Sequence, residues 1–512
     1  MTFTVAYILI AAFLLMVAAT VIVSITGKGK KNFILAIYVI FFFYTIGQSF
    51  YYEKVLPGTS PDEIAHISYV VYLHDTNAVI PKFEDMHLIS GMLNWSEEPW
   101  YKYIDDLTNY VCHPPLYYQI MRLSCGIEDT ANYHLYSIYK TRMRHFSLGI
   151  FAIGLILLLY IGYSRISKDK PLLHLFYATA ATGIPMLAFE GCAVTNDNLA
   201  LVTACITILG LIRFSEKKRG YLTYILIAVG ITASLLTKMT TALMCIIMAV
   251  MILFFCMLKE RSIKASLKKE FFVTIPIYCF ALAYFGIMYK NYGTIQPSLE
   301  LICTKEYFES TVYYIDPADR VVFGSFGEFT KFYFSQFFLS WSGIVSTYGT
   351  YLKAAATTKT AMVMNVLWLF PVFILVPAVR KQNNALALPV FTGWLACILT
   401  NMLQFKSAWG VYLTRGYLGG NQARYYLPFI FALAMALSFI FTSLEQPVDG
   451  TPGVGNSLSQ KNEASGFRNQ LSRRFIINHI LYAVAIGYTA LLFYSNMPFF
   501  LLHYGATARL PF

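Results

Sequence analysis

The stretch FILAIYVIFFFYTIGQSFY, residues 33–51, is almost wholly apolar, and the acidic motif PDEIAH follows shortly after it at residues 61–66. About 20 apolar residues are enough for a helix to cross the hydrocarbon core of a bilayer. The stretch therefore predicts a membrane-spanning helix that leads into two adjacent carboxylates and a histidine.

Similar apolar runs recur along the whole chain. The 512 residues are 57% hydrophobic and 13% charged, whereas soluble domains carry about 25% charged residues. These composition figures predict an all-α polytopic membrane protein. We expect about twelve transmembrane helices, at roughly 5–25, 33–51, 146–163, 172–190, 197–212, 221–237, 240–258, 271–289, 361–379, 386–404, 425–443 and 476–495.

Basic residues gather in alternate short loops between these runs. They are Lys28, Lys30, Lys31, Arg165, Lys168, Lys170, Arg213, Lys217, Lys218, Arg219, Lys259, Arg261, Lys264, Lys268, Lys269, Arg380 and Lys381. Short loops rich in Lys and Arg lie on the cytoplasmic side of membrane proteins. The alternation predicts that both termini and the long segments 52–145 and 291–360 lie on the outer face. It also accounts for the net charge of +12 without a nucleic-acid partner.

The chain is expected to divide into seven segments. They are two N-terminal spans (1–51), a first outer loop (52–145), spans three to eight (146–290), a second outer loop (291–360), spans nine to eleven (361–443), a flexible cytoplasmic linker (444–475), and the last span with an outer C-terminus (476–512). The first outer loop contains amphipathic stretches, which predict helices that lie along the membrane surface.

The motif SPDE, residues 60–63, fits both a helix start and a catalytic acid. Ser60 as N-cap, Pro61 at the first helical position and Glu63 make a capping box. A helix start also stabilises an ionised carboxylate, and His66 lies on the same face one turn later. We expect Asp62 to be catalytic, with Glu63 as a second candidate. His66 is either a hydrogen-bonding helper or, with the two acids, a ligand for Mg²⁺ or Mn²⁺.

The motif CHPPLYYQ, residues 112–119, lies later in the same outer loop. A residue that precedes proline is held in an extended conformation. The motif is therefore either a packed helix start or a rigid corner that directs His113 toward the site.

Further charged residues map to the outer ends of spans. Asp197 opens one span, and Lys238, in LLTKMTT, lies in a very short hairpin between two others. Lys238 either extends to the head groups or binds a lipid phosphate. Arg415 and Arg424 lie in and just after TRGYLGG, and a guanidinium suits phosphate because it donates two parallel hydrogen bonds. We expect at least one of these three cations to bind phosphate.

Five motifs together resemble the GT-C superfamily of membrane glycosyltransferases, and more narrowly the DUF2142 family related to protein O-mannosyltransferases and aminoarabinose transferases. They are PDEIAH, HPPLYY, TNDNLA, LLTKMTT and QARYYLP, and the resemblance covers about residues 33–443. It implies a GT-C-like fold in which Asp62 is the catalytic carboxylate, Lys238 and Arg424 hold the donor phosphate, and His113 lies beside the site. An additional apolar run at 5–25 departs from the family pattern.

The resemblance implies an inverting glycosyltransferase at the extracytoplasmic face of the cell membrane. Charged nucleotide sugars do not cross a bilayer, so the donor is expected to be a polyprenyl-phosphate sugar. The acceptor is a glycan, a glycolipid or a protein, and the two cations can make a metal unnecessary. Two alternatives remain open: a lipid or glycan transporter, and a non-catalytic assembly factor that binds a lipid-linked glycan. Transporters place ionisable residues near the bilayer midplane, whereas the acids here gather toward one surface.

Overall fold

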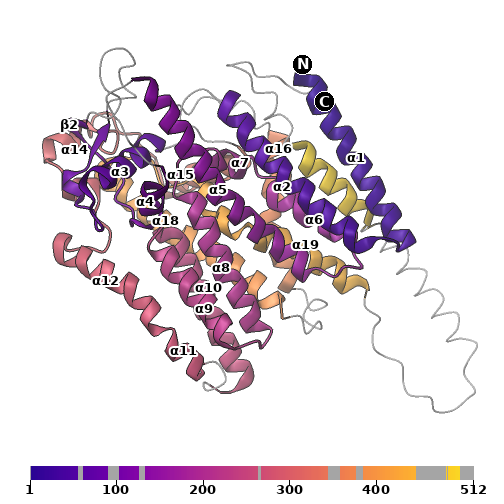
Figure 1. Ribbon diagram of the computed structural model, residues 1–512. Coiled ribbons are helices and arrows are strands. Elements are labelled where there is room, and N and C mark those ends of the chain that lie inside the picture. The colour runs from indigo at the N-terminus through magenta and orange to yellow at the C-terminus, as the bar shows by residue number, and fades with distance from the viewer. Residues whose placement is uncertain are drawn as a thin grey trace, which may run out of the picture.

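The computed structural model is mostly helical (Figure 1). It describes residues 2–55, 62–89, 103–125, 133–262, 267–343, 358–375, 385–445, 480 and 482–495. The expected linker at 444–475 lies almost wholly outside these residues.

Within the described residues, six helices are long and apolar enough to cross a membrane. They are α1 (Thr2–Thr26), α2 (Lys30–Val55), α5 (Tyr133–Arg165), α8 (Asp197–Ser215), α10 (Met239–Glu260) and α18 (Ala387–Arg415). The chain is therefore a multi-pass membrane protein. The count of twelve spans stays a prediction, because the other apolar runs form shorter or broken helices: α9 (Tyr221–Leu235), α12 (Ile275–Tyr292), α16 (Thr358–Asn365) with η3 (Val366–Leu375), η4 (Ala423–Phe429) with α19 (Ile430–Glu445), and Tyr482–Ser495.

The run predicted as one span at 172–190 is broken. It forms α6 (Pro171–Thr182) and α7 (Pro185–Gly191), bent by 61°. Pro185 cannot donate the backbone hydrogen bond that would continue α6, so the helix ends before it. Every residue of α6 and α7 is buried. The break lies in the interior of the bundle and turns the end of α7 toward the site described below.

Small residues allow the helices around this core to approach closely. A Cβ on Gly230 of α9 would lie 2.3 Å from the Thr207 hydroxyl of α8, and a Cβ on Gly162 of α5 would lie 2.1 Å from the Tyr177 ring of α6. Small residues at such crossings are typical of membrane helices, whose association depends on close packing.

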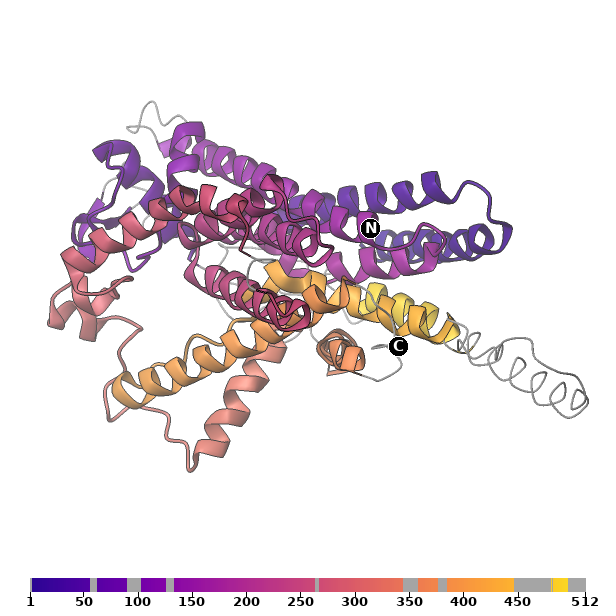
Figure 2. The ribbon, with the colours of Figure 1, turned by 90° about the horizontal axis from the view of Figure 1, so that it is seen from below.

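The short elements gather at one end of the bundle, at the left in both ribbon views (Figures 1 and 2). They are α3 (Glu63–Thr76), η1 (Phe83–Asp85), β1 (His87–Ile89), β2 (Tyr103–Thr108), α4 (Leu116–Cys125), α13 (Leu299–Ile302) and α14 (Lys305–Ser310). The all-α prediction is wrong in one detail, because β1 and β2 form an antiparallel pair with Leu88 opposite Ile104. A separate hydrophobic cluster joins α3 to α4, where the Tyr69 and Tyr118 rings stack with centroids 3.8 Å apart.

Ion pairs connect the basic loops to one another. Lys30 lies 4.0 Å from Asp169, Arg165 lies 2.6 Å from Glu216, and Arg219 lies 2.6 Å from Glu260. These pairs join the turns after α1, α5, α8 and α10, as expected of loops on one side of the membrane. Two connecting segments complete the described chain: α11 (Lys269–Val273), which precedes α12, and α15 (Phe326–Ser342), which packs against α16.

Candidate active site

Asp62 adopts a strained backbone conformation at the start of α3. The helix begins at Glu63, and Asp62 is its N-cap with φ 65°, in the left-handed region. The predicted capping box is therefore wrong: Ser60 lies outside the described residues, and the helix starts after Asp62. Residues other than glycine rarely adopt this backbone conformation, although Asp tolerates it better than most. Such strain is concentrated at functional sites.

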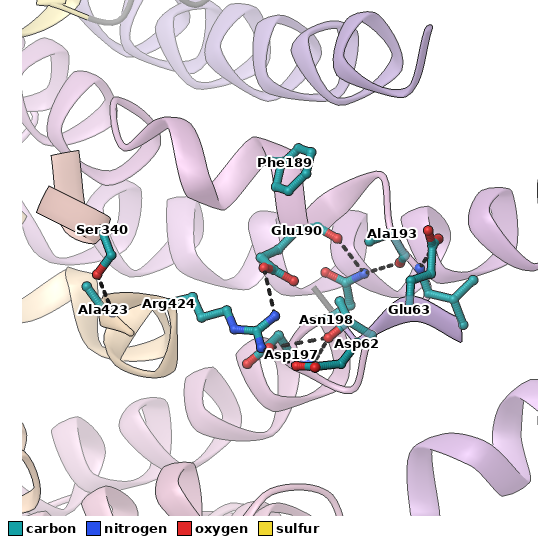
Figure 3. A network of polar contacts seen from close by, with 12 residues as sticks. Asp62, Glu63, Phe189, Glu190, Ala193, Asp197, Asn198, Ser340, Ala423 and Arg424 are labelled. Atoms are coloured by element: carbon teal, nitrogen blue, oxygen red, sulfur yellow. Dashed lines mark hydrogen bonds and ion pairs between the residues drawn. The ribbon is translucent and has the colours of Figure 1, made fainter. Parts of the chain in front are cut away.

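The Asp62 carboxylate has a different partner on each oxygen; Figure 3 shows the one with Arg424. Its Oδ2 accepts a hydrogen bond from Nη2 of Arg424 at 2.7 Å, and its Oδ1 accepts one from the Tyr110 hydroxyl at 3.0 Å. Burial raises the pKa of the Asp62 carboxyl, but the Arg424 guanidinium, with smaller contributions from His66 and the Tyr110 hydroxyl, brings the pKa down to about 2. The carboxylate is thus ionised at neutral pH, and 34% of its side-chain surface is exposed.

Arg424 connects two acidic residues that are far apart in the sequence. It lies in η4, is only 4% exposed, and donates from Nη1 to Glu190 at 3.4 Å as well as from Nη2 to Asp62. Figure 3 shows the guanidinium between the two carboxylates, with Glu190 at the end of α7. A buried arginine in this position holds α3, α7 and η4 together through charge-assisted hydrogen bonds.

Lys238 forms a second buried ion pair beside the first. It is the N-cap of α10, is 5% exposed, and donates to the Asp197 carboxylate at the start of α8. The interpretation of Lys238 as a side chain extended to the head groups is therefore wrong. Its Nζ lies 4.5 Å from the centroid of the Tyr425 ring, and the Arg424 guanidinium lies 5.4 Å from the same centroid. One aromatic ring thus contacts both cations.

Two hydrogen bonds fix the hairpin that carries Lys238. The backbone N–H of Leu116, just after the two prolines, donates to the Leu236 carbonyl at 3.0 Å. The side chain of Asn196 donates to the Thr237 carbonyl at 3.0 Å. The HPPLYY and TNDNLA motifs therefore hold LLTKMTT from two sides, which explains how distant parts of the sequence form one site.

His66 and His113 face each other next to Asp62. Their ring centroids are 6.0 Å apart, and Nδ1 of His66 lies 2.7 Å from the Tyr118 hydroxyl. Burial, and then the repulsion between two protonated imidazoles when His113 also titrates, lower the pKa of His66 to about 3. Burial and the Lys238 ammonium lower the pKa of His113 to about 4. Both imidazoles are neutral at pH 7, so they offer hydrogen bonds rather than charge.

Glu63 points away from this centre. Arg144 of α5 donates to both of its oxygens, at 2.7 and 2.6 Å, and the Val194 N–H donates to it at 3.0 Å. The side chain is fully buried, and Arg144 lowers the pKa of its carboxyl although burial opposes this. In the described part of the chain no three His, Cys, Asp or Glu side chains are placed to hold a metal ion. The expected ligand set of Asp62, Glu63 and His66 is therefore not formed.

Arg415 lies at a different place from the other expected phosphate ligands. It ends α18, pairs with Glu300, and lines a cavity of about 570 Å³. Tyr110, Tyr425 and Glu190 were not among the expected site residues. Tyr425 directly follows Arg424 in QARYYLP, which was the available signal. Tyr110 had none, because its contact with Asp62 depends on how the 109–115 segment folds back over α3.

Fold and site together define a multi-pass helical membrane protein with a mixed-charge centre at one end of its helices. A profile described as "Predicted membrane protein (DUF2142)" matches residues 53–433. The chain therefore belongs to the DUF2142 family, which confirms the family expected from the five motifs. A comparison with curated proteins found no match.

Two solved structures resemble the chain. ArnT from Cupriavidus metallidurans in the apo state matches with a TM-score of 0.44 and 12% identity, over 93% of this chain and 76% of that chain. The same protein bound to undecaprenyl phosphate matches with a TM-score of 0.43 and 10% identity, over 92% of this chain and 75% of that chain. Identity this low transfers no residue roles, so the roles below are derived from the contacts of this chain.

Proposed function

We propose that the protein is a membrane glycosyltransferase that moves a sugar from a polyprenyl-phosphate donor to an acceptor hydroxyl. The observation that carries the proposal is the meeting of an ionised, partly exposed carboxylate with two buried cations. Asp62 supplies the carboxylate, and Lys238 and Arg424 supply the cations around the Tyr425 ring. A base next to an anion-binding pair is the arrangement that transfer from a phosphate leaving group requires.

Asp62 takes the proton of the acceptor hydroxyl in this reaction. The hydroxyl oxygen forms a bond to the anomeric carbon while the bond from that carbon to the phosphate oxygen breaks, which inverts the anomeric centre. The lipid phosphate leaves with the electron pair, and Lys238 and Arg424 stabilise its charge. By the positive-inside pattern of the loops, the site lies on the extracytoplasmic face.

The donor phosphate must compete with carboxylates for both cations. Asp197 holds Lys238, while Asp62 and Glu190 hold Arg424. Three carboxyl groups therefore surround two cations, so a bound phosphate must replace at least one of them as a partner. We infer that the phosphate displaces Asp62 from Arg424. That exchange raises the pKa of Asp62 and makes it a better proton acceptor, since a base works best when its pKa is near the working pH.

A transporter is the second candidate, because one observation favours it. The broken pair α6–α7 is fully buried, bends by 61°, and ends at the buried Glu190. In many transporters the substrate path is lined by interrupted helices that carry ionisable residues near the break. The exposed fraction of Asp62 favours the enzyme, because a proton acceptor must reach its substrate.

The test uses purified protein in liposomes with a panel of polyprenyl-phosphate hexoses and a crude cell-envelope acceptor fraction. Release of free polyprenyl phosphate is followed for the wild type and for Asp62→Asn, which keeps a residue that tolerates the left-handed backbone. Release by the wild type alone supports the proposal. Equal release by both removes Asp62 from the mechanism. If intact donor crosses the bilayer without release of polyprenyl phosphate, and Glu190→Gln abolishes this movement, the protein is a transporter instead.

A further inference from the structure

The cavity beside Arg415 is separate from the buried cations and has no role in the reaction as derived so far. Its volume of about 570 Å³ lies within the range of about 300–1,000 Å³ that is usual for small-molecule sites. It is lined by Glu300, Cys303, Lys305, Phe308, Glu309, Tyr314, Thr414 and Arg415. These residues come from α13, α14, the segment after α14, and the end of α18.

The lining is charged but balanced. Glu300 and Glu309 carry two negative charges, and Lys305 and Arg415 carry two positive charges. Arg415 pairs with Glu300, and Lys305 lies 3.6 Å from Glu309. A neutral lining with many donors and acceptors suits a polyhydroxylated, uncharged ligand better than a phosphate or an acyl chain, since neither ionic excess nor a continuous apolar surface is present.

Aromatic rings form part of the same wall. The Phe308 and Tyr314 rings lie with centroids 6.2 Å apart, and the Arg415 guanidinium lies 5.1 Å from the Phe308 centroid. The wall is fixed by hydrogen bonds from the Ile315 N–H to the Arg415 carbonyl at 2.9 Å, and from Arg320 to the Thr414 carbonyl at 3.0 Å. Phe308 is buried beneath Arg415 and supports the wall, whereas Tyr314 is partly exposed and offers the ring on which a sugar can stack next to the carboxylates.

A row of tyrosines connects this wall to Asp62. Tyr314 lines the cavity, and the neighbouring Tyr313 packs on Tyr110 with ring centroids 5.3 Å apart. Tyr110 in turn donates to Oδ1 of Asp62. The opposite oxygen, Oδ2, faces Arg424 and the phosphate side. An inverting displacement requires the acceptor to approach from the side away from the leaving phosphate, and the contacts from Tyr313 to Tyr110 lead from the cavity wall to the Asp62 oxygen that does not face Arg424.

We propose that the cavity binds the acceptor, and that the acceptor is a neutral glycan chain. This inference rests on the proposed function. Sugar units next to the reacting hydroxyl pack against Tyr314, and their hydroxyls donate to Glu300 and Glu309 and accept from Arg415. Arg415 is thereby a ligand of acceptor hydroxyls and not of the donor phosphate.

Kinetics with separate variation of donor and acceptor tests the assignment. With a neutral envelope polysaccharide fraction as acceptor, Tyr314→Ala and Glu309→Gln are expected to raise the acceptor KM at least about ten-fold and to leave the donor KM unchanged. Lys238→Ala is expected to do the reverse. Glu306→Gln is the matched control, because Glu306 is exposed on the same helix but does not line the cavity.

A second measurement does not depend on turnover. Cys303 lines the cavity, so its alkylation by a maleimide in a Cys125→Ser, Cys279→Ser background reports on occupancy. The polysaccharide fraction is expected to slow alkylation, whereas polyprenyl phosphate is not. If Tyr314→Ala fails to fold, the alkylated enzyme serves as the blocked variant and must show the raised acceptor KM.

The outcomes separate the two proposals. Transfer by the wild type with an unchanged acceptor KM in the cavity variants overturns the cavity assignment and leaves the enzyme proposal standing. Protection of Cys303 by polyprenyl phosphate also overturns it, because the cavity then belongs to the donor. Absence of transfer with every donor overturns the proposed function and this inference with it.

Discussion

Asp62 and Glu63 are neighbours in the sequence, and each pairs with an arginine, yet their surroundings differ. Glu63 receives three hydrogen bonds and is fully buried. Asp62 receives one hydrogen bond on each oxygen and leaves 34% of its side-chain surface exposed. The difference arises at one backbone position, because the left-handed conformation of Asp62 turns its side chain out of the helix that Glu63 begins. The two neighbouring carboxylates therefore differ in role: Glu63 anchors the fold, and Asp62 is the candidate base for the reaction.

The largest expected effect is on turnover in Asp62→Asn. Removal of the general base is expected to reduce kcat by about 10²- to 10⁴-fold, with the fold intact because Asn accepts both the backbone conformation and a hydrogen bond. The measurement is release of polyprenyl phosphate from saturating donor, with the thermal unfolding temperature as the control for folding. Retention of more than a tenth of wild-type kcat would contradict a base role for Asp62.

Glu63→Gln is expected to affect stability instead. It removes the closer of the two carboxylates that pair with Arg144, and leaves Glu53 at 3.9 Å as the remaining one. Breaking a buried pair costs about 3–5 kcal/mol. The free energy of unfolding in detergent is expected to fall by that order, and the unfolding temperature with it. Glu63→Gln combined with Arg144→Met removes both charges and is expected to recover part of the loss.

A matched control for Glu63 is Glu53→Gln. Glu53 lies 3.9 Å from the same arginine but makes a longer contact at the edge of the site. If Glu63→Gln unfolds no more easily than Glu53→Gln yet loses turnover as completely as Asp62→Asn, the distinction between the two neighbouring acids is wrong.

Much of this site was predictable, because its parts are short motifs at the ends of apolar runs. PDEIAH, HPPLYY, TNDNLA, LLTKMTT and QARYYLP were expected on one side of the membrane, and Asp62, His113, Asp197, Lys238 and Arg424 do come together. The pairing among them was not predictable. Whether Asp62 or Glu63 faces the cations depends on the residue at which α3 begins, and the capping signal placed that start too early.

Arg415 shows a second reason for failure. It lies close to Arg424 in the sequence, which favoured a shared role. Gly416, with φ 69°, ends α18 and turns the chain, and a Cβ there would lie 2.6 Å from the Arg320 side chain. The turn places Arg415 against Glu300, and the chain then continues to Arg424 in the buried core. Hydropathy alone likewise could not show the break before Pro185, since both halves of that run are equally apolar.

Arg424→Gln tests how Arg424 affects turnover and the ionisation of Asp62. Loss of one preorganised donor to developing negative charge is expected to cost about 10²- to 10³-fold in kcat. The guanidinium also holds the pKa of Asp62 near about 2, so its removal raises that pKa. The acid limb of the kcat/KM profile is expected to move to higher pH in Arg424→Gln and to stay in place in Arg424→Lys. If the acid limb lies at the same pH in both variants, Arg424 does not control the ionisation of Asp62.

Tyr110→Phe removes the other hydrogen bond to Asp62. A hydrogen bond to a charged group contributes about 1.5–3 kcal/mol, so kcat/KM is expected to fall about 10- to 150-fold. Tyr307→Phe is the control, because the Tyr307 hydroxyl bonds the Thr108 carbonyl at 3.3 Å and not the acid. Equal losses in both variants would indicate general loosening of this end of the molecule and not a specific effect on Asp62.

The last effect concerns His66 and His113 and appears in folding stability as a function of pH, not in turnover. Their folded-state pKa values of about 3 and about 4 lie below the ordinary value of about 6.5. Between about pH 4 and 6.5 the unfolded chain therefore binds protons that the folded chain excludes. Folding stability is full above about pH 6.5 and declines on acidification, by at most about 1.4 kcal/mol per pH unit for each histidine.

His113→Asn removes one of these proton sites and is expected to reduce that slope between about pH 4 and 6.5. Asp62 does not obscure the result, since its lowered pKa affects stability only below about pH 4. Unfolding temperatures in detergent at a series of pH values provide the measurement. An unchanged slope would mean that His113 is protonated inside the folded protein. In that case it would add a third positive charge beside Lys238 and Arg424, and the phosphate would have a cationic partner without displacing Asp62.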